Sequence, residues 1–106
     1  MVQRWPAVPI AEKTIARSAR SSLADGAKHG YAMMSDIETM TGIRLGAGTL
    51  YGALARLESA GLIKAVASKD RRRPYQLTAK GVGALREQLA LLQKLASTGL
   101  KRLASQ

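Results

Sequence analysis

A long amphipathic segment near the C-terminal end constrains the fold more than any other part of this sequence. It runs from Ala79 to Ala104, and Thr78 before it is a good helix N-cap. Seven apolar or small positions follow one another in alternating three- and four-residue steps: Val82, Leu85, Leu89, Leu92, Ala96, Gly99 and Leu103. Such a stripe needs more apolar surface to pack on than the small core of a 106-residue chain provides. We therefore expect a dimerisation helix, the alternative being a helix folded back on its own domain.

Glycines divide the preceding part of the chain into three short helical segments. Apolar residues recur at helical spacing over residues 11–25, 31–41 and 46–60. Each segment is followed by a glycine, which is favoured just past a helix end: Gly26, Gly42 and Gly61. In the second segment the apolar positions are Met33, Met34, Ile37 and Met40. The pattern predicts a first helix followed by two short helices joined by a tight loop.

The first of these segments combines an apolar face with several cations. Apolar positions recur at helical spacing along it and just past its end: Ile15, Ala16, Ala19, Leu23, Ala24 and Ala27. We expect Lys13, Arg17 and Arg20 to lie on other faces of this helix. The excess of arginine and serine over acidic residues here is also typical of a transit peptide. The helical spacing favours the helix.

The pattern changes between the third segment and the long C-terminal one. Residues 62–67 form a short β-prone run, residues 68–74 are strongly basic, and residues 75–77 are β-prone again. This predicts a hairpin with a basic tip. The fold class is therefore mainly α with a small β-hairpin wing. We expect a winged helix-turn-helix over residues 1–78 and the dimerisation helix over residues 79–106, together one compact unit.

The charge of the chain points to a polyanionic partner. The formal net charge is +10, which favours nucleic acid first and an anionic membrane surface second. There is no cysteine, so disulfides and thiolate ligands are excluded and a reducing cytoplasm is expected. The longest stretch without a charge, residues 45–55, is far short of the roughly 20 apolar residues that span a membrane.

The inventory of reactive side chains argues against an enzyme. The single histidine, His29, has no obvious acidic partner, and no phosphate-binding glycine motif is present. Asp36 and Glu38 lie close in sequence but point apart on a helix. We expect no catalysis, no metal and no cofactor.

Three short motifs resemble the PadR family of bacterial regulators in order, spacing and residue type. They are His29-Gly30-Tyr31, Gly48-Thr49-Leu50-Tyr51 and Tyr75-Gln76-Leu77-Thr78, within a resemblance that covers Leu23 to Leu92. The resemblance implies a cytoplasmic, nucleoid-associated homodimer that represses transcription from a double-stranded DNA operator, with a small-molecule inducer left unknown. In this family the third helices enter successive major grooves. The segment from Ala16 to Ser22 is more polar than the bulky aliphatic run usual there, so its packing against the fourth helix is an open question.

The third helix has a small outer face. At about 100° per residue, Leu50, Leu54 and Leu57 turn inward. The outward residues are Gly48, Thr49, Gly52, Ala55 and Arg56, with Tyr51 at the flank. Glycine and alanine let a helix backbone approach the groove floor closely, so part of the specificity is expected to come from DNA shape.

Candidate DNA contacts come from the third helix, the wing and the start of the second helix. They are Thr49, Tyr51, Gly52, Arg56, Lys69, Arg71, Arg72, Arg73, His29 and Tyr31. For Tyr51 the alternative is packing between helices, and for Arg56 and the wing arginines it is a solvated surface. His29 caps a helix, packs against Tyr31 or approaches a phosphate. For the whole chain, the alternative function is a winged-helix module for protein contacts or for non-specific coating of DNA.

Overall fold

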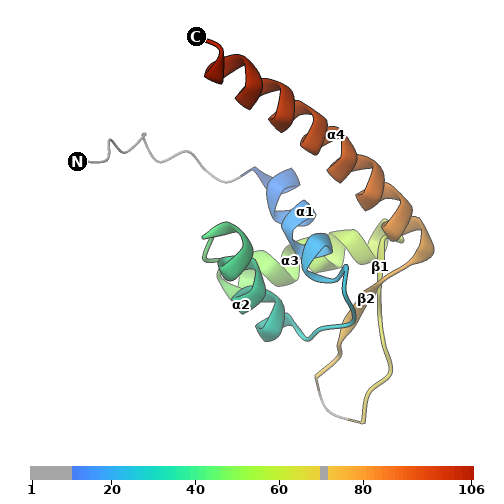
Figure 1. Cartoon of the computed structure of the whole chain (residues 1–106). Coiled ribbons are helices and arrows are strands. Elements are labelled where there is room, and N and C mark those ends of the chain that lie inside the picture. The colour runs from blue at the N-terminus through green and yellow to red at the C-terminus, as the bar shows by residue number, and fades with distance from the viewer. Residues whose placement is uncertain (1–10, 70–71) are drawn as a thin grey trace.

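Four helices and one hairpin make up the fold over residues 11–69 and 72–106, which are the residues that this computed structural model describes (Figure 1). The elements are α1 (Glu12–Ser22), α2 (Gly30–Thr41), α3 (Ala47–Ser59), β1 (Ile63–Ala65), β2 (Tyr75–Leu77) and α4 (Ala79–Ala104). The predicted fold class, mainly α with a hairpin wing and a C-terminal helix, is confirmed. No helix in this described part is both long and apolar enough to cross a membrane.

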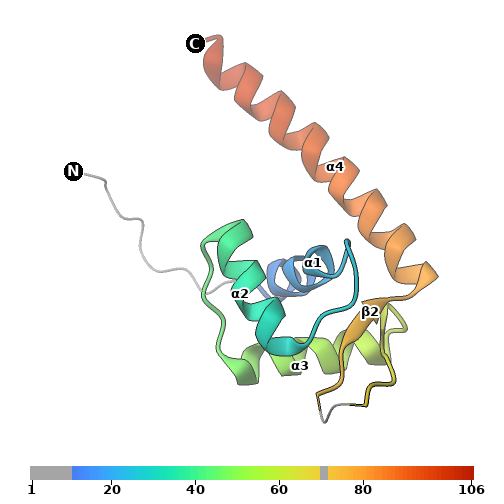
Figure 2. The same ribbon diagram turned by 60° about the horizontal axis from the view of Figure 1, so that its bottom comes forward.

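The first three helices pack around one apolar core. Its buried members are Ala19, Leu23, Met33, Ile37, Leu45, Leu50, Leu54, Leu57 and Ile63. The three leucines that were expected to face inward from the third helix all belong to this core. Met40 does not, because it lies at the end of α2 and is 46% exposed. Figure 2 shows α1, α2 and α3 gathered into one body, which α4 leaves at an angle.

The end of α1 lies earlier than the sequence pattern predicts. The helix stops at Ser22 rather than Asp25, because the next N–H groups turn back to carbonyls only three residues away, as in Leu23 to Arg20 at 3.0 Å. The Lys28 ammonium donates to both the Ser22 carbonyl and the Asp25 carboxylate. The hydrogen bond that Lys28 donates to the Asp25 carboxylate, together with the positive charge of Lys28, lowers the pKa of Asp25. A longer helix would need the Ser22 carbonyl as a backbone hydrogen-bond acceptor, but here the Lys28 ammonium occupies it.

The buried side of α1 is more polar than expected. Ser18, Arg20 and Ser22 are all buried, so the expectation that Arg20 lies away from the packed face is wrong. Their polar atoms find partners, as buried polar groups must. Ser22 Oγ donates to Asp36 Oδ2 of α2 at 2.7 Å, and Arg20 Nη2 donates to Gln88 Oε1 of α4 at 2.6 Å. The first helix therefore makes a polar contact with the fourth, from Arg20 to Gln88.

The hairpin is anchored on both sides at its base. β1 and β2 pair antiparallel with Ile63 opposite Leu77 and Ala65 opposite Tyr75. On the other side of β2, Lys28 pairs with Tyr75: each N–H donates to the other's carbonyl, at 3.0 and 2.9 Å. This short bridge fixes the wing against the residues that lead into α2.

The first turns of α4 dock directly onto the end of α3 and the start of β1. Thr78 Oγ1 accepts from the Gly81 N–H at 3.0 Å, which confirms the predicted N-cap, and donates to the Gly61 carbonyl at 2.6 Å. A Cβ added to Gly81 would lie 1.9 Å from the Leu62 carbonyl oxygen, so only glycine permits this approach. Beyond Leu85, every residue of α4 except Gly99 is exposed. In this chain α4 therefore does not fold back on its own domain.

Candidate nucleic-acid interface

One face of α3 is open to solvent and carries small residues. Gly48, Thr49 and Ala55 are exposed, and Gly52 is half-buried. A Cβ added to Gly52 would lie 3.6 Å from Arg56 Nη1, so the arginine side chain runs along the helix beside this glycine. Arg56 also forms an ion pair with Glu12 of α1. The backbone of α3 is thus accessible along most of this face, with one guanidinium held at its α1 side.

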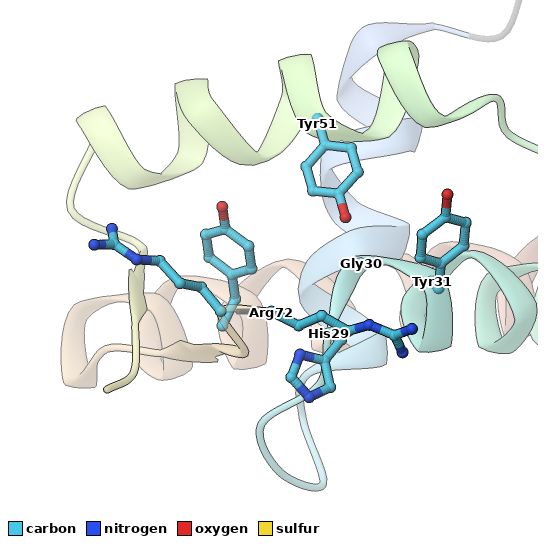
Figure 3. A pocket seen from close by; sticks show the side chains of 7 residues that line it. His29, Gly30, Tyr31, Tyr51 and Arg72 are labelled. Atoms are coloured by element: carbon cyan, nitrogen blue, oxygen red, sulfur yellow. The ribbon is translucent and has the colours of Figure 1, made fainter. Parts of the chain in front are cut away.

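A cavity of about 350 Å³ lies next to this face, where three separate parts of the chain meet (Figure 3). Its lining comes from the start of α2, from α3 and from the wing: His29, Gly30, Tyr31, Tyr51, Arg72, Arg73 and Tyr75. The bridge between Lys28 and Tyr75 brings the wing to the start of α2. The cavity therefore brings together residues of all three family motifs. His29, Gly30 and Tyr31 form the first motif, Tyr51 comes from the second and Tyr75 from the third.

Gly30 and Tyr51 fit into one another in this cavity. A Cβ added to Gly30 would lie 2.3 Å from the Tyr51 hydroxyl oxygen and 2.6 Å from Cζ, both far inside contact distance. Figure 3 shows the Tyr51 ring directed from α3 toward Gly30. The ring remains 42% exposed. Tyr51 therefore both packs between the helices and presents a hydroxyl to the cavity.

The cavity is a collection of hydrogen-bond donors. Arg72 and Arg73 bring two guanidinium groups, which are exposed on the wing. His29 precedes α2 without capping it through its side chain, and its buried Nδ1 has no hydrogen-bond partner. The positive end of the α2 dipole lies at the same place. Among the described lining residues there is no Asp or Glu, so the cavity suits an oxyanion.

The structure brings only some of the predicted contact residues into this cavity. Thr49 and Arg56 lie outside it, on the flank of α3 that faces α1, and Lys69 is exposed on the wing. Arg71 lies outside the described residues. Tyr75 was missed as a site residue, because its place depends on a backbone pairing with Lys28 for which the sequence carries no local signal. No group of three or more His, Cys, Asp or Glu side chains in residues 11–69 and 72–106 could hold a metal ion.

A helix pair, a basic hairpin and a donor-lined cavity at their junction are the parts of a winged helix-turn-helix protein. The sequence profile of the PadR-like family of transcriptional regulators matches residues 21–87, and the chain belongs to this family. A PadR family regulator from Eggerthella lenta is 31% identical, with a TM-score of 0.70 over 86% of this chain and 82% of that one. A PadR-like regulator from Bacillus cereus is 18% identical and shows the same fold, with a TM-score of 0.74 over 90% of this chain and 95% of that one.

One curated relative is similar over a shorter stretch. It is an uncharacterised 37.1 kDa protein in transposon TN4556 of Streptomyces fradiae, 53% identical over 60 residues. That stretch is 57% of this chain and 17% of the relative. The chain therefore spans only a small part of that protein's length.

Proposed function

We propose that this protein is a sequence-specific DNA-binding repressor that acts as a homodimer on a double-stranded operator in the bacterial cytoplasm, on the nucleoid. The observation that carries the proposal is the donor-lined cavity beside the open face of α3. Its donors come from three elements and converge without a carboxylate among the described lining residues. A DNA backbone phosphate is the oxyanion that a winged helix meets next to the groove it enters.

In the proposed complex, α3 lies in the major groove with its glycine-rich face toward the bases. Gly52 allows close approach of the backbone, and Thr49 and Arg56 supply hydrogen-bonding groups to base edges. Arg56 must exchange its ion pair with Glu12 for a base or a phosphate. Because that pair is exposed, the exchange costs little.

The wing and the cavity then supply contacts to the DNA backbone. A phosphate in the cavity accepts from the Tyr51 hydroxyl and the guanidinium groups of Arg72 and Arg73. His29 and Tyr31 stand beside it at the start of α2, where the helix dipole favours an anion. Lys69, exposed on the wing, extends the same basic surface toward the neighbouring phosphates or the minor groove. Arg71, which lies outside the described residues, remains a proposed DNA contact from its sequence alone.

The homodimer rests on the long fourth helix. Of the proposed dimerisation residues, Leu85 is buried in the chain's own fold, whereas Val82, Leu89, Leu92, Ala96 and Leu103 are exposed. A contiguous exposed apolar stripe of this kind is typical of an interaction surface. In a symmetric dimer paired through α4, a two-fold axis would relate the two α3 helices, as a palindromic operator requires.

Selection of genomic DNA fragments by the purified protein tests this proposal. We expect enrichment of an inverted repeat whose half-sites lie one helical turn or a multiple of it apart, roughly 34–36 Å per turn. Binding to the selected site should exceed binding to random DNA by at least about a thousandfold at physiological salt. Equal affinity for all duplexes would instead show a DNA-coating protein, and no DNA binding would show a module for protein contacts. A transcription assay on the selected site then distinguishes repression from activation.

A further inference from the structure

The hydrogen bonds of the donor-lined cavity leave the side chain of His29 without a task. The residue lines the cavity, yet its buried Nδ1 has no hydrogen-bond partner (Figure 3). We propose that His29 takes up one proton from solvent when a DNA phosphate enters the cavity, so that DNA binding strengthens as the pH falls. This inference rests on the proposed function, because it concerns the regulation of the same site.

The backbone holds His29 in the angle between α2 and the wing. Its carbonyl accepts from the Met33 N–H at 3.0 Å, which is the first hydrogen bond of α2. The preceding residue, Lys28, pairs with Tyr75 of β2 through two backbone hydrogen bonds. Because the chain is fixed on both sides of His29, the imidazole is held in the wall of the cavity.

No hydrogen bond to a described residue commits this imidazole to one protonation state. Buried polar atoms nearly always have a partner, so the unpartnered Nδ1 is an exception. Within residues 11–69 and 72–106, the side chain also forms no ion pair with an Asp or a Glu. A carboxylate or carbonyl acceptor would fix the position of a proton on the ring. His29 can instead respond to a charge that enters the cavity.

The groups that face His29 carry positive charge or none. The ionisable residues in the described lining are Tyr31 of α2, Tyr51 of α3, Tyr75 of β2, and Arg72 and Arg73 of the wing. Lys28, next to His29 in the chain, already has Asp25 as its counter-charge. A phosphate would therefore bring negative charge to a lining that has none among its described residues. Negative charge favours the imidazolium form of a histidine, in which both ring nitrogens are donors.

The composition of the chain makes this proton easy to trace. Histidine ordinarily changes its charge between about pH 5 and pH 8, whereas phenol and guanidinium groups do not. His29 is the single histidine, and there is no cysteine. The α-amino group of the purified chain is the other group that ordinarily titrates near this range. If the complex binds more protons than the free protein, affinity rises as the pH falls, by at most about tenfold per pH unit for one proton.

Binding of a random-sequence duplex at about pH 8, 7 and 6, at one ionic strength, tests the proposal. A random duplex suffices because the proposed contact is with a phosphate and not with a base. We expect the affinity to rise by roughly three- to tenfold per protomer engaged across this range. Calorimetry in two buffers of different ionisation enthalpy should show uptake of up to about one proton per chain.

Three variants assign the proton. His29→Gln cannot take it up and should lose both the rise in affinity and the uptake. His29→Lys keeps a positive charge throughout this range and should bind as tightly at about pH 8 as at about pH 6. Lys69→Met is the matched control, because it removes an exposed cation of the wing and leaves the histidine in place. It should weaken binding and keep the pH dependence.

Thermal unfolding at the highest and lowest pH checks that each variant is folded. A folded His29→Gln variant that keeps the pH dependence would overturn the proposal and assign the proton to another group, such as the α-amino group. An unmodified protein whose DNA affinity is the same at all three pH values would overturn it too. In both cases the proposed DNA-binding function stands. If no duplex binds at any pH, the proposed function itself fails, and this inference fails with it.

Discussion

At Gly30, the lack of a side chain decides how the second and third helices can approach each other. The Tyr51 hydroxyl occupies the space that a Cβ would need, 2.3 Å away. The backbone conformation of Gly30 is an ordinary helical one, so the requirement for glycine comes from a neighbour and not from a turn. This contact therefore links the start of α2 to Tyr51, whose hydroxyl we propose to contact a DNA phosphate.

Gly30→Ala should lower the free energy of unfolding by about 1–3 kcal/mol, because either Tyr51 or the start of α2 must move. In a Tyr51→Ala background the same change should cost much less, since the obstructing ring is gone. Chemical denaturation of the four proteins of this cycle measures the coupling. Strictly additive effects would mean that the two residues do not share this space.

The arginines of α3 and of the wing are assigned different tasks, and salt dependence separates them. Arg72→Ala should weaken operator and random DNA about equally and reduce the slope of log affinity against log salt by roughly one per wing engaged. Arg56→Ala should weaken the operator by about 1–3 kcal/mol and random DNA by less. Titrations on operator and scrambled duplexes at several salt concentrations provide both numbers. A change of sequence preference in the Arg72 variant, at an unchanged slope, would assign Arg72 to the bases or to groove width.

At the scale of elements, the sequence predicts most of the fold because its apolar periods are strong. The long helix over residues 79–104 has the predicted bounds. The second helix begins one residue earlier than predicted, and the third is one residue shorter than predicted at each end. The predicted first helix is three residues too long at its C-terminal end, because alanines beyond Ser22 continue the apolar spacing. Its end is fixed instead by turn hydrogen bonds and by Lys28, which a periodicity does not reveal.

The candidate site was predicted residue by residue but not as a cavity. His29, Tyr31, Tyr51 and the wing arginines were identified from charge and family motifs. Their meeting in one cavity depends on the pairing of Lys28 with Tyr75, 47 residues apart. Long-range backbone pairing leaves no mark in a local pattern. The buried Arg20 was missed for a related reason: a cation is expected at the surface until its neighbours on another element are known.

Gly52 provides a test of how α3 meets DNA. A Cβ there makes only an ordinary contact, so Gly52→Ala should stabilise α3 by about 0.5–1 kcal/mol through the better helix propensity of alanine. We also expect it to weaken operator binding, because the added methyl group stands between the backbone and the groove. Gly83→Ala is the matched control: it is a helix-interior glycine on α4 with open space around it. That variant should gain stability and keep its DNA affinity. Equal operator affinities of the two variants would argue against close approach at Gly52.

At the scale of the whole molecule, the fold consists of a packed three-helix body and a helix that projects from it (Figure 2). The exposed leucines of α4 have no partner in the described part of the chain, and their stripe is continuous along the helix. In the proposed homodimer, the same stripe on a second copy would match it in length and spacing.

Leu89→Glu should shift the protein from dimer to monomer, because it places a charge in an apolar seam. Sedimentation velocity measures this shift at a chain concentration of roughly tens of micromolar, at which two α4 helices of this length are expected to pair. Glu87→Gln, on an exposed position outside the stripe, is the control and should remain dimeric. An unmodified protein that sediments as a monomer, or a Leu89 variant that remains fully dimeric, would contradict the assignment of α4.

The contact between Gly81 and the Leu62 carbonyl has a mechanical consequence for such a dimer. Only Thr78 separates β2 from α4, and its hydroxyl is hydrogen-bonded both to Gly61 and to Gly81. No flexible linker therefore connects the base of α4 to the three-helix body. The helix then works as a rigid lever about 39 Å long, given 1.5 Å per residue. A tilt of only about 10° at its base would move the far end by roughly 7 Å over that length. In the proposed dimer the far ends of the two α4 helices are held together. The same tilt would then move the two three-helix bodies relative to each other, and their α3 helices would no longer match the spacing of successive major grooves.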